Sequence, residues 1–218
     1  MHSRMRISRL IAISAGISLI TLAVGAATSY AVRPFHLETF HLSSLQDDYT
    51  NPDGYLVPLI GTFIGQLLLI GAAVGFGRRL RQTHPVLAYV ASTLLLTAVV
   101  LLSVNSIHEY LGIEDTHVHA VLAHIGFGLM ILAHISFIYL AERDFGNRGR
   151  FNIRNDLRIA LFSFVVVVSL FLIPLFTGVD VTQLVFGFSV DLILGLCEVI
   201  YLTIFFVSLW RTARTLEV

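Results

Sequence analysis

Histidines are the residues of this chain best suited to chemistry, and most of them are clustered. The chain has nine histidines, and five of them lie between His108 and His134. His117 and His124 are seven residues apart, so on an α-helix of 3.6 residues per turn they share one face. Neutral imidazoles bind divalent metals and exchange protons near neutral pH. The face that carries His117 and His124 is therefore the first candidate site.

Two acids form the second candidate. Asp191 and Glu198 are also seven residues apart and interrupt an otherwise apolar segment. An ionisable side chain at membrane depth costs about 2.5–3.5 kcal/mol, so it should face protein or water and not lipid. Counted from the ends of their apolar segments, Asp191 and His124 fall at similar depth. This predicts a hydrogen bond between them.

Three hypotheses account for these polar residues. In the first, they form hydrogen bonds between helices and fix the packing. In the second, His117, His124, Asp191 and acids of the outer loop bind zinc or another divalent ion and hydrolyse a lipid amide or ester, although the HExxH motif is absent. In the third, a proton or small-molecule path runs past Asp191, Glu198 and His124, as in transporters. Haem is a further alternative, with His84 and His134 as its two axial ligands.

The composition indicates that these residues lie in a membrane protein. Of 218 residues, 56% are hydrophobic and only 13% are charged, about half the charged fraction of a soluble domain. The mean hydropathy is +0.83. The formal net charge is zero, so nothing indicates binding to nucleic acid. A chain of this kind suits a bilayer, where apolar surface can face outward.

Six apolar segments are long enough to span a bilayer as helices, which requires about 20 residues each. The chain is therefore predicted to be an all-α, polytopic transmembrane helix bundle that forms a single integral membrane domain over residues 1–218. The predicted spans are residues 10–32, 55–77, 83–107, 116–141, 159–179 and 181–210.

The arginines predict the orientation of these spans. All 14 basic residues are arginine, and 13 of them fall at the ends or in the connections on one side of the bundle. The positive-inside rule makes this side cytoplasmic. We therefore expect a multi-pass protein of a prokaryotic plasma membrane with both termini in the cytoplasm. The first span is predicted to be a retained anchor, because a signal peptide has a shorter apolar region of about 7–15 residues.

Four glycines in the second span form two small-xxx-small pairs, Gly61 with Gly65 and Gly71 with Gly75. Such pairs let helix backbones approach closely. They predict either packing within the chain or a homo-oligomer that associates through this face.

Three short motifs resemble domain of unknown function family 998, a family of prokaryotic six-span membrane proteins with no assigned activity. The His-Leu-Ser-Ser-Leu-Gln run at 41–46 resembles the motif that follows the first span. The Glu-Asp-Thr-His run at 114–117 resembles the acidic turn before a histidine at the start of span four. The Gly-Leu-Cys-Glu run at 195–198 resembles the Gly-x-x-Glu of the last span.

The resemblance covers nearly the whole chain and departs from the family at two points. Ser-Ser-Leu-Gln stands in place of the usual Ser-Asp-Leu-Gly, and Val199 stands in place of the usual arginine. The resemblance implies six spans and adds Ser44 to His117 and Glu198 as residues of interest. For function, we expect a membrane protein that binds lipid or a small ligand. The metal-dependent hydrolase and the proton-coupled transporter are the alternatives.

Overall fold

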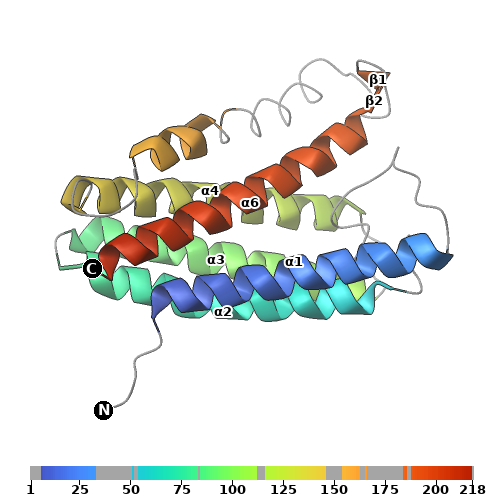
Figure 1. The fold of residues 1–218 in the computed structure, drawn as a ribbon, viewed down its shortest axis with the longest axis horizontal. Helices are drawn as coiled ribbons and strands as arrows, with labels where there is room; N and C mark the ends of the chain where they lie inside the picture. The colour runs from blue at the N-terminus through green and yellow to red at the C-terminus, as the bar shows by residue number, and fades with distance from the viewer. Residues whose placement is uncertain are drawn as a thin grey trace, which may run out of the picture.

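Long apolar helices dominate the computed structural model. It describes residues 6–32, 51, 54–82, 84–111, 116–145, 154–162, 165, 184–185 and 188–217. Within these ranges the labelled helices are α1 (Ile7–Val32), α2 (Leu56–Leu80), α3 (Pro85–Tyr110), α4 (Thr116–Phe145) and α6 (Val190–Leu216). A further helical stretch covers residues 154–162. Figure 1 shows α1, α2 and α3 running lengthwise, with α6 crossing them obliquely.

Among the described residues, five helical segments are long and apolar enough to cross a membrane: Ile7–Thr28, Leu56–Leu80, Pro85–His108, Val121–Arg143 and Val199–Leu216. They correspond to five of the six predicted spans, and the all-α, polytopic transmembrane architecture is confirmed. Most of the remaining predicted span, residues 159–179, lies outside the described residues.

The helix ends differ from the predicted spans because charged residues extend the helices. α2 continues through Arg78 and Arg79, and α4 continues through Arg143. Basic side chains are favourable near a helix C-terminus, and their long stems let the charge reach water. A span predicted from hydropathy ends at its first charge, whereas the helix continues beyond it, so these helices are longer than the predicted spans.

The last span starts later than predicted. The prediction began it at Val181, whereas α6 begins at Val190. Before it, β1 (Leu184–Val185) and β2 (Phe188–Ser189) form an antiparallel pair in which Leu184 lies opposite Ser189. Aromatic and β-branched residues favour strands, and glycine, which occurs here as Gly187, disfavours helix. A short apolar run of this kind is compatible with either a strand or a helix, so the sequence did not show where the helix begins.

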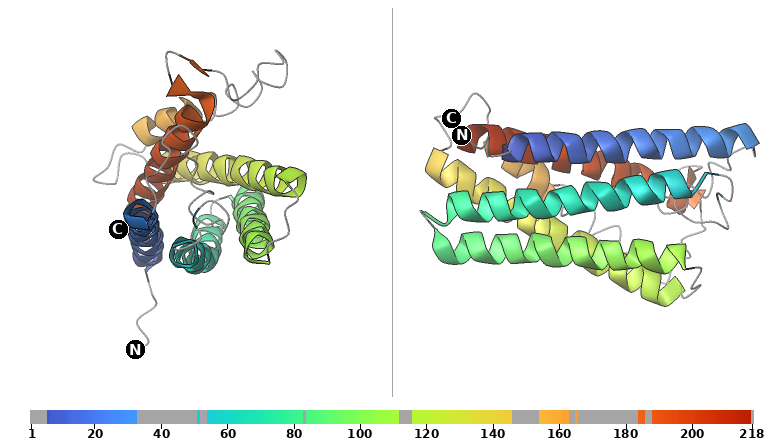
Figure 2. Two further views of the ribbon diagram at one scale, coloured as in Figure 1. Left: turned by 90° about the vertical axis from the view of Figure 1, so that its right-hand side faces the viewer. Right: turned by 90° about the horizontal axis from the view of Figure 1, so that it is seen from below.

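The helices pack in a closed series. α1 contacts α2, α2 contacts α3, α3 contacts α4, and α6 contacts both α4 and α1. The end-on view in Figure 2 shows this arrangement, with α4 strongly inclined to α1, α2 and α3. α1 begins, α2 ends, and both α4 and α6 end at the same end of the bundle. We call it the arginine-rich end because it carries Arg78, Arg79, Arg81, Arg143, Arg211 and Arg214.

The core among the described residues lies in the half of the bundle next to the arginine-rich end. Its largest fully buried side chains include Phe76, Phe137 and Phe205. The rings of Phe76 and Phe137 stack with centroids 4.7 Å apart. This packing fixes α2, α4 and α6 relative to one another at that end.

The glycines of α2 pack against α1 within the same chain. A Cβ at Gly61 would overlap Thr21, and one at Gly65 would overlap Ser18. The absence of a side chain lets Ser14 Oγ donate a hydrogen bond to the carbonyl oxygen of Gly65 at 2.7 Å. The glycine face of α2 is therefore occupied by packing within the chain, which is one of its two predicted uses. A second copy would have to displace α1 to associate there, and oligomerisation itself stays a prediction.

Candidate functional site

The predicted polar cluster is spread over two helices. The structure places His117 and His124 on α4, and Asp191 and Glu198 on α6. The side chains of these four residues are outside the part of the chain that the structure describes, and Ser44 lies wholly outside it. The zinc site, the hydrogen bond between His124 and Asp191, and the path along α6 therefore stay predictions. Among the described residues there is no group of three or more His, Cys, Asp or Glu side chains that could hold a metal ion.

A different histidine joins α4 to α6 in the described structure. The side chain of His134 is fully buried, and its Nε2 is hydrogen-bonded to Ser208 Oγ. Ser208 Oγ also donates to the carbonyl oxygen of Phe205 at 3.2 Å. A hydroxyl has one proton to donate, so we assign the donor in the first bond to His134 Nε2. This leaves His134 Nδ1 as an acceptor, and no described residue donates a hydrogen bond to it.

Aromatic rings enclose this pair. Phe205 meets the His134 imidazole edge-on with centroids 5.1 Å apart, and Tyr201 does so at 6.3 Å. The Tyr201 hydroxyl is also buried, and it has no hydrogen-bond partner within the part of the chain that the structure describes. A serine beside a histidine can act as nucleophile and base, but a substrate would have to reach it. With His134 0% and Ser208 2% exposed, the arrangement supports helix packing and not catalysis.

The sequence contained a signal for this contact that the prediction did not use. Tyr201, Phe205, Ser208 and Thr212 follow a spacing of four, three and four residues, which places them on one helix face. His134 was considered only as a haem ligand with His84. Iron ligation through Nε2 would require the bond to Ser208 to break, and the haem alternative stays a prediction.

An apolar groove runs between α1 and α6 at the surface of the bundle. Its volume is about 230 Å³. Small residues of α1, Ala12 and Ala15, lie opposite the large Phe206 and Trp210 of α6. Leu19, which lines the groove as well, is 47% exposed. The groove is therefore open to the surroundings of the bundle, and in a membrane those surroundings are lipid.

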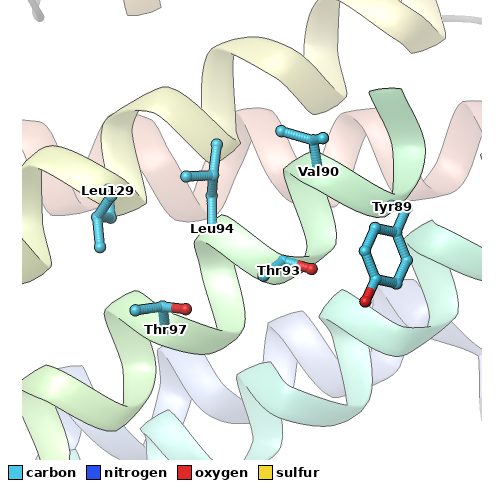
Figure 3. Close-up of a pocket in the computed structure, with 6 residues that line it drawn as sticks. All are labelled: Tyr89, Val90, Thr93, Leu94, Thr97 and Leu129. Carbon is cyan, nitrogen blue, oxygen red and sulfur yellow. The ribbon is translucent and has the colours of Figure 1, made fainter. Parts of the chain in front are cut away.

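A second groove of about 220 Å³ lies between α3 and α4. Figure 3 shows Val90 and Leu94 on α3 with Leu129 of α4 opposite them. Thr93 and Thr97 line the same groove and carry its hydroxyl groups. Tyr89, at the end of the row, is 74% exposed.

The arginine-rich end contains most of the charged contacts among the described residues. The carboxylate of Glu217 accepts hydrogen bonds from Ser8 N at 3.0 Å and from Ser8 Oγ at 2.7 Å. Arg79 Nε donates to the carbonyl oxygen of Leu216 at 3.1 Å. The backbone N–H groups in the first turn of a helix have no partner within the helix, so Glu217 caps the start of α1 from the end of α6.

Two ion pairs join the segment 154–162 to its neighbours. Arg211 Nη1 lies 2.9 Å from Asp156 Oδ1, and Arg154 Nε lies 3.0 Å from Glu142 Oε1. Burial raises the pKa of the Asp156 carboxyl, while its hydrogen bond to Arg211 and the arginine charge act in the opposite direction. A buried carboxylate is thus held at the arginine-rich end by the guanidinium of Arg211.

Comparisons of the chain with protein-family models, curated proteins and solved structures found no match.

Proposed function

We propose that this protein is a multi-pass protein of a prokaryotic plasma membrane that binds lipid in grooves between its helices, with both termini in the cytoplasm. The observation that supports lipid binding best is the groove between α1 and α6. Its walls are almost wholly apolar, and it opens at the surface of a helix bundle built from spans of membrane length. Acyl chains are the partners available to such a surface in a bilayer.

The distribution of arginine supports the orientation. The connection between α2 and α3 carries Arg81, and α6 ends with Arg211 and Arg214. The bonds between Ser8 and Glu217 hold the start of α1 and the end of α6 together. The start of α1 and the end of α6 therefore lie at the end of the bundle that the positive-inside rule assigns to the cytoplasm.

Lipid retention tests the proposed function. Protein purified in mild detergent should carry phospholipid that native mass spectrometry detects as bound adducts. Ala12→Phe should reduce that lipid, because Ala12 lines the groove and is exposed, so the new ring occupies the groove without entering the core. Ile13→Phe is the matched control, since Ile13 is 45% exposed and does not line the groove. Equal retention in wild type and both variants would contradict a lipid site in this groove.

A further inference from the structure

The groove between α1 and α6 ends beside arginines that form no ion pair with any residue that the structure describes. We propose that it holds an anionic phospholipid of the leaflet at the arginine-rich end, with an acyl chain along the groove and the phosphate between Arg9 and Arg214. The inference rests on the proposed lipid-binding function and adds the chemical class of the headgroup.

On α6, the residues that line the groove share one helix face with an arginine at the end of the helix. Thr203, Val207 and Trp210 line the groove, and Arg214 follows them with the spacing four, three and four. Residues so spaced lie on one face of a helix. Trp210 precedes Arg214 by one turn, about 6 Å along the axis. Tryptophan side chains settle at headgroup depth in membranes, so Arg214 lies where the headgroup of a lipid in the groove would be.

On α1, the helix begins next to this face. The hydrogen bonds from Ser8 to Glu217 hold the first turn of α1 against the last turn of α6. Arg9 follows Ser8 directly and precedes Ala12, a groove residue, by three positions. The end of the groove is therefore flanked by a guanidinium from each helix.

The charges at this end of the groove favour an anion. Arg6, Arg9 and Arg214 are exposed, and no ion pair or side-chain hydrogen bond involves them within the described ranges. The nearby acid is Glu217, and both of its oxygens accept hydrogen bonds from Ser8. By contrast, Arg154 and Arg211 are already paired with carboxylates. Guanidinium groups bind phosphate oxygens through two parallel hydrogen bonds, which suits the phosphodiester of an anionic lipid.

The test is competition between two lipids on the purified full chain. Wild-type protein in detergent is mixed with equal amounts of phosphatidylglycerol and phosphatidylethanolamine, and native mass spectrometry quantifies each bound lipid. We expect phosphatidylglycerol to be preferred. Arg9→Gln/Arg214→Gln should reduce its affinity by about thirtyfold, given the usual contribution of each of the two arginines near anionic lipid. The exposure of both side chains means that the variant should keep its fold, which thermal unfolding verifies.

A matched variant separates a defined site from general surface charge. Arg81→Gln/Arg158→Gln removes the same charge from exposed arginines outside the α1 and α6 helices. It should leave the preference for phosphatidylglycerol unchanged. An equal loss in both double variants, or no preference in wild type, would overturn the headgroup site. If Ala12→Phe lowers the binding of both lipids while the Arg9→Gln/Arg214→Gln variant keeps the wild-type ratio, this inference fails and the proposed function stands. If Ala12→Phe changes nothing, the proposed function fails.

Discussion

His134 shows how a single polar residue can join two apolar helices. Its Nε2 bonds Ser208 Oγ, and rings from α6 surround it. In a bilayer, apolar surfaces gain little by leaving lipid for each other, so interhelical hydrogen bonds carry more of the specificity. We therefore interpret His134 and Ser208 as the contact that fixes the position of α6 against α4.

Ser208→Ala should destabilise the folded protein, because it leaves the buried N–H of His134 without an acceptor. The expected cost lies between about 0.6 kcal/mol, the average for an interhelical hydrogen bond in a membrane protein, and about 3 kcal/mol for an unsatisfied buried donor. Unfolding in detergent measures it. Ser136→Ala is the control, since Ser136 Oγ donates an exposed hydrogen bond to Leu132 O within the same helix, α4. Equal costs for the two variants would contradict the role given to Ser208.

Asp156 should make stability depend on pH. Burial raises the pKa of its carboxyl above its ordinary value of 3.8, so the folded chain binds this proton at a pH where the unfolded chain has released it. The free energy of unfolding should therefore decrease as pH rises from about 4 through the folded-state pKa, and then level off.

Asp156→Asn should remove this contribution while it keeps an oxygen that accepts from Arg211. Thermal unfolding in detergent between about pH 4 and pH 7 compares the two proteins, with Glu142→Gln as a control at the neighbouring ion pair. A slope that persists unchanged in Asp156→Asn would show that another group causes it.

At the scale of helices, the sequence predicted which segments form helices far better than it predicted the residues at which these helices begin and end. Long apolar runs correctly indicated α1, α2, α3, α4 and α6, although the last run carries two acids. The pair of short strands before Val190 was missed, because apolar residues there suit strand and helix equally. The contact between His134 and Ser208 was missed for a related reason. The sequence analysis used membrane depth and charge, which single out ionisable residues such as Asp191. A contact between two neutral side chains depends instead on how each helix is rotated about its axis.

Gly61→Ala tests how closely α1 and α2 must approach. The new Cβ would overlap the Thr21 side chain at its branch point, so the helices must separate, and we expect a loss of about 1–3 kcal/mol. Gly16→Ala in α1 is the control, because a Cβ there meets nothing within 4 Å. It should stabilise the helix by about 0.5–1 kcal/mol. Reversible unfolding in micelles measures both, and similar stabilities for the two variants would refute the close approach.

For the whole molecule, the arrangement of charge predicts which end faces the cytoplasm. Single cysteines can be introduced after Cys197→Ala has removed the native thiol. Asp48→Cys should react with a membrane-impermeant maleimide in intact cells, whereas Ser3→Cys should react only after permeabilisation. The reverse pattern would show that the bundle is inserted the other way round.

The cap on α1 has a consequence for biosynthesis. Glu217 lies 209 positions after Ser8, so α1 is synthesised long before the residue that caps its first turn. Helices that insert one by one can remain loosely associated until such a closing contact forms. A nascent chain stalled before α6 would therefore expose the start of α1, and quality-control proteases of the membrane should degrade it faster than the finished protein.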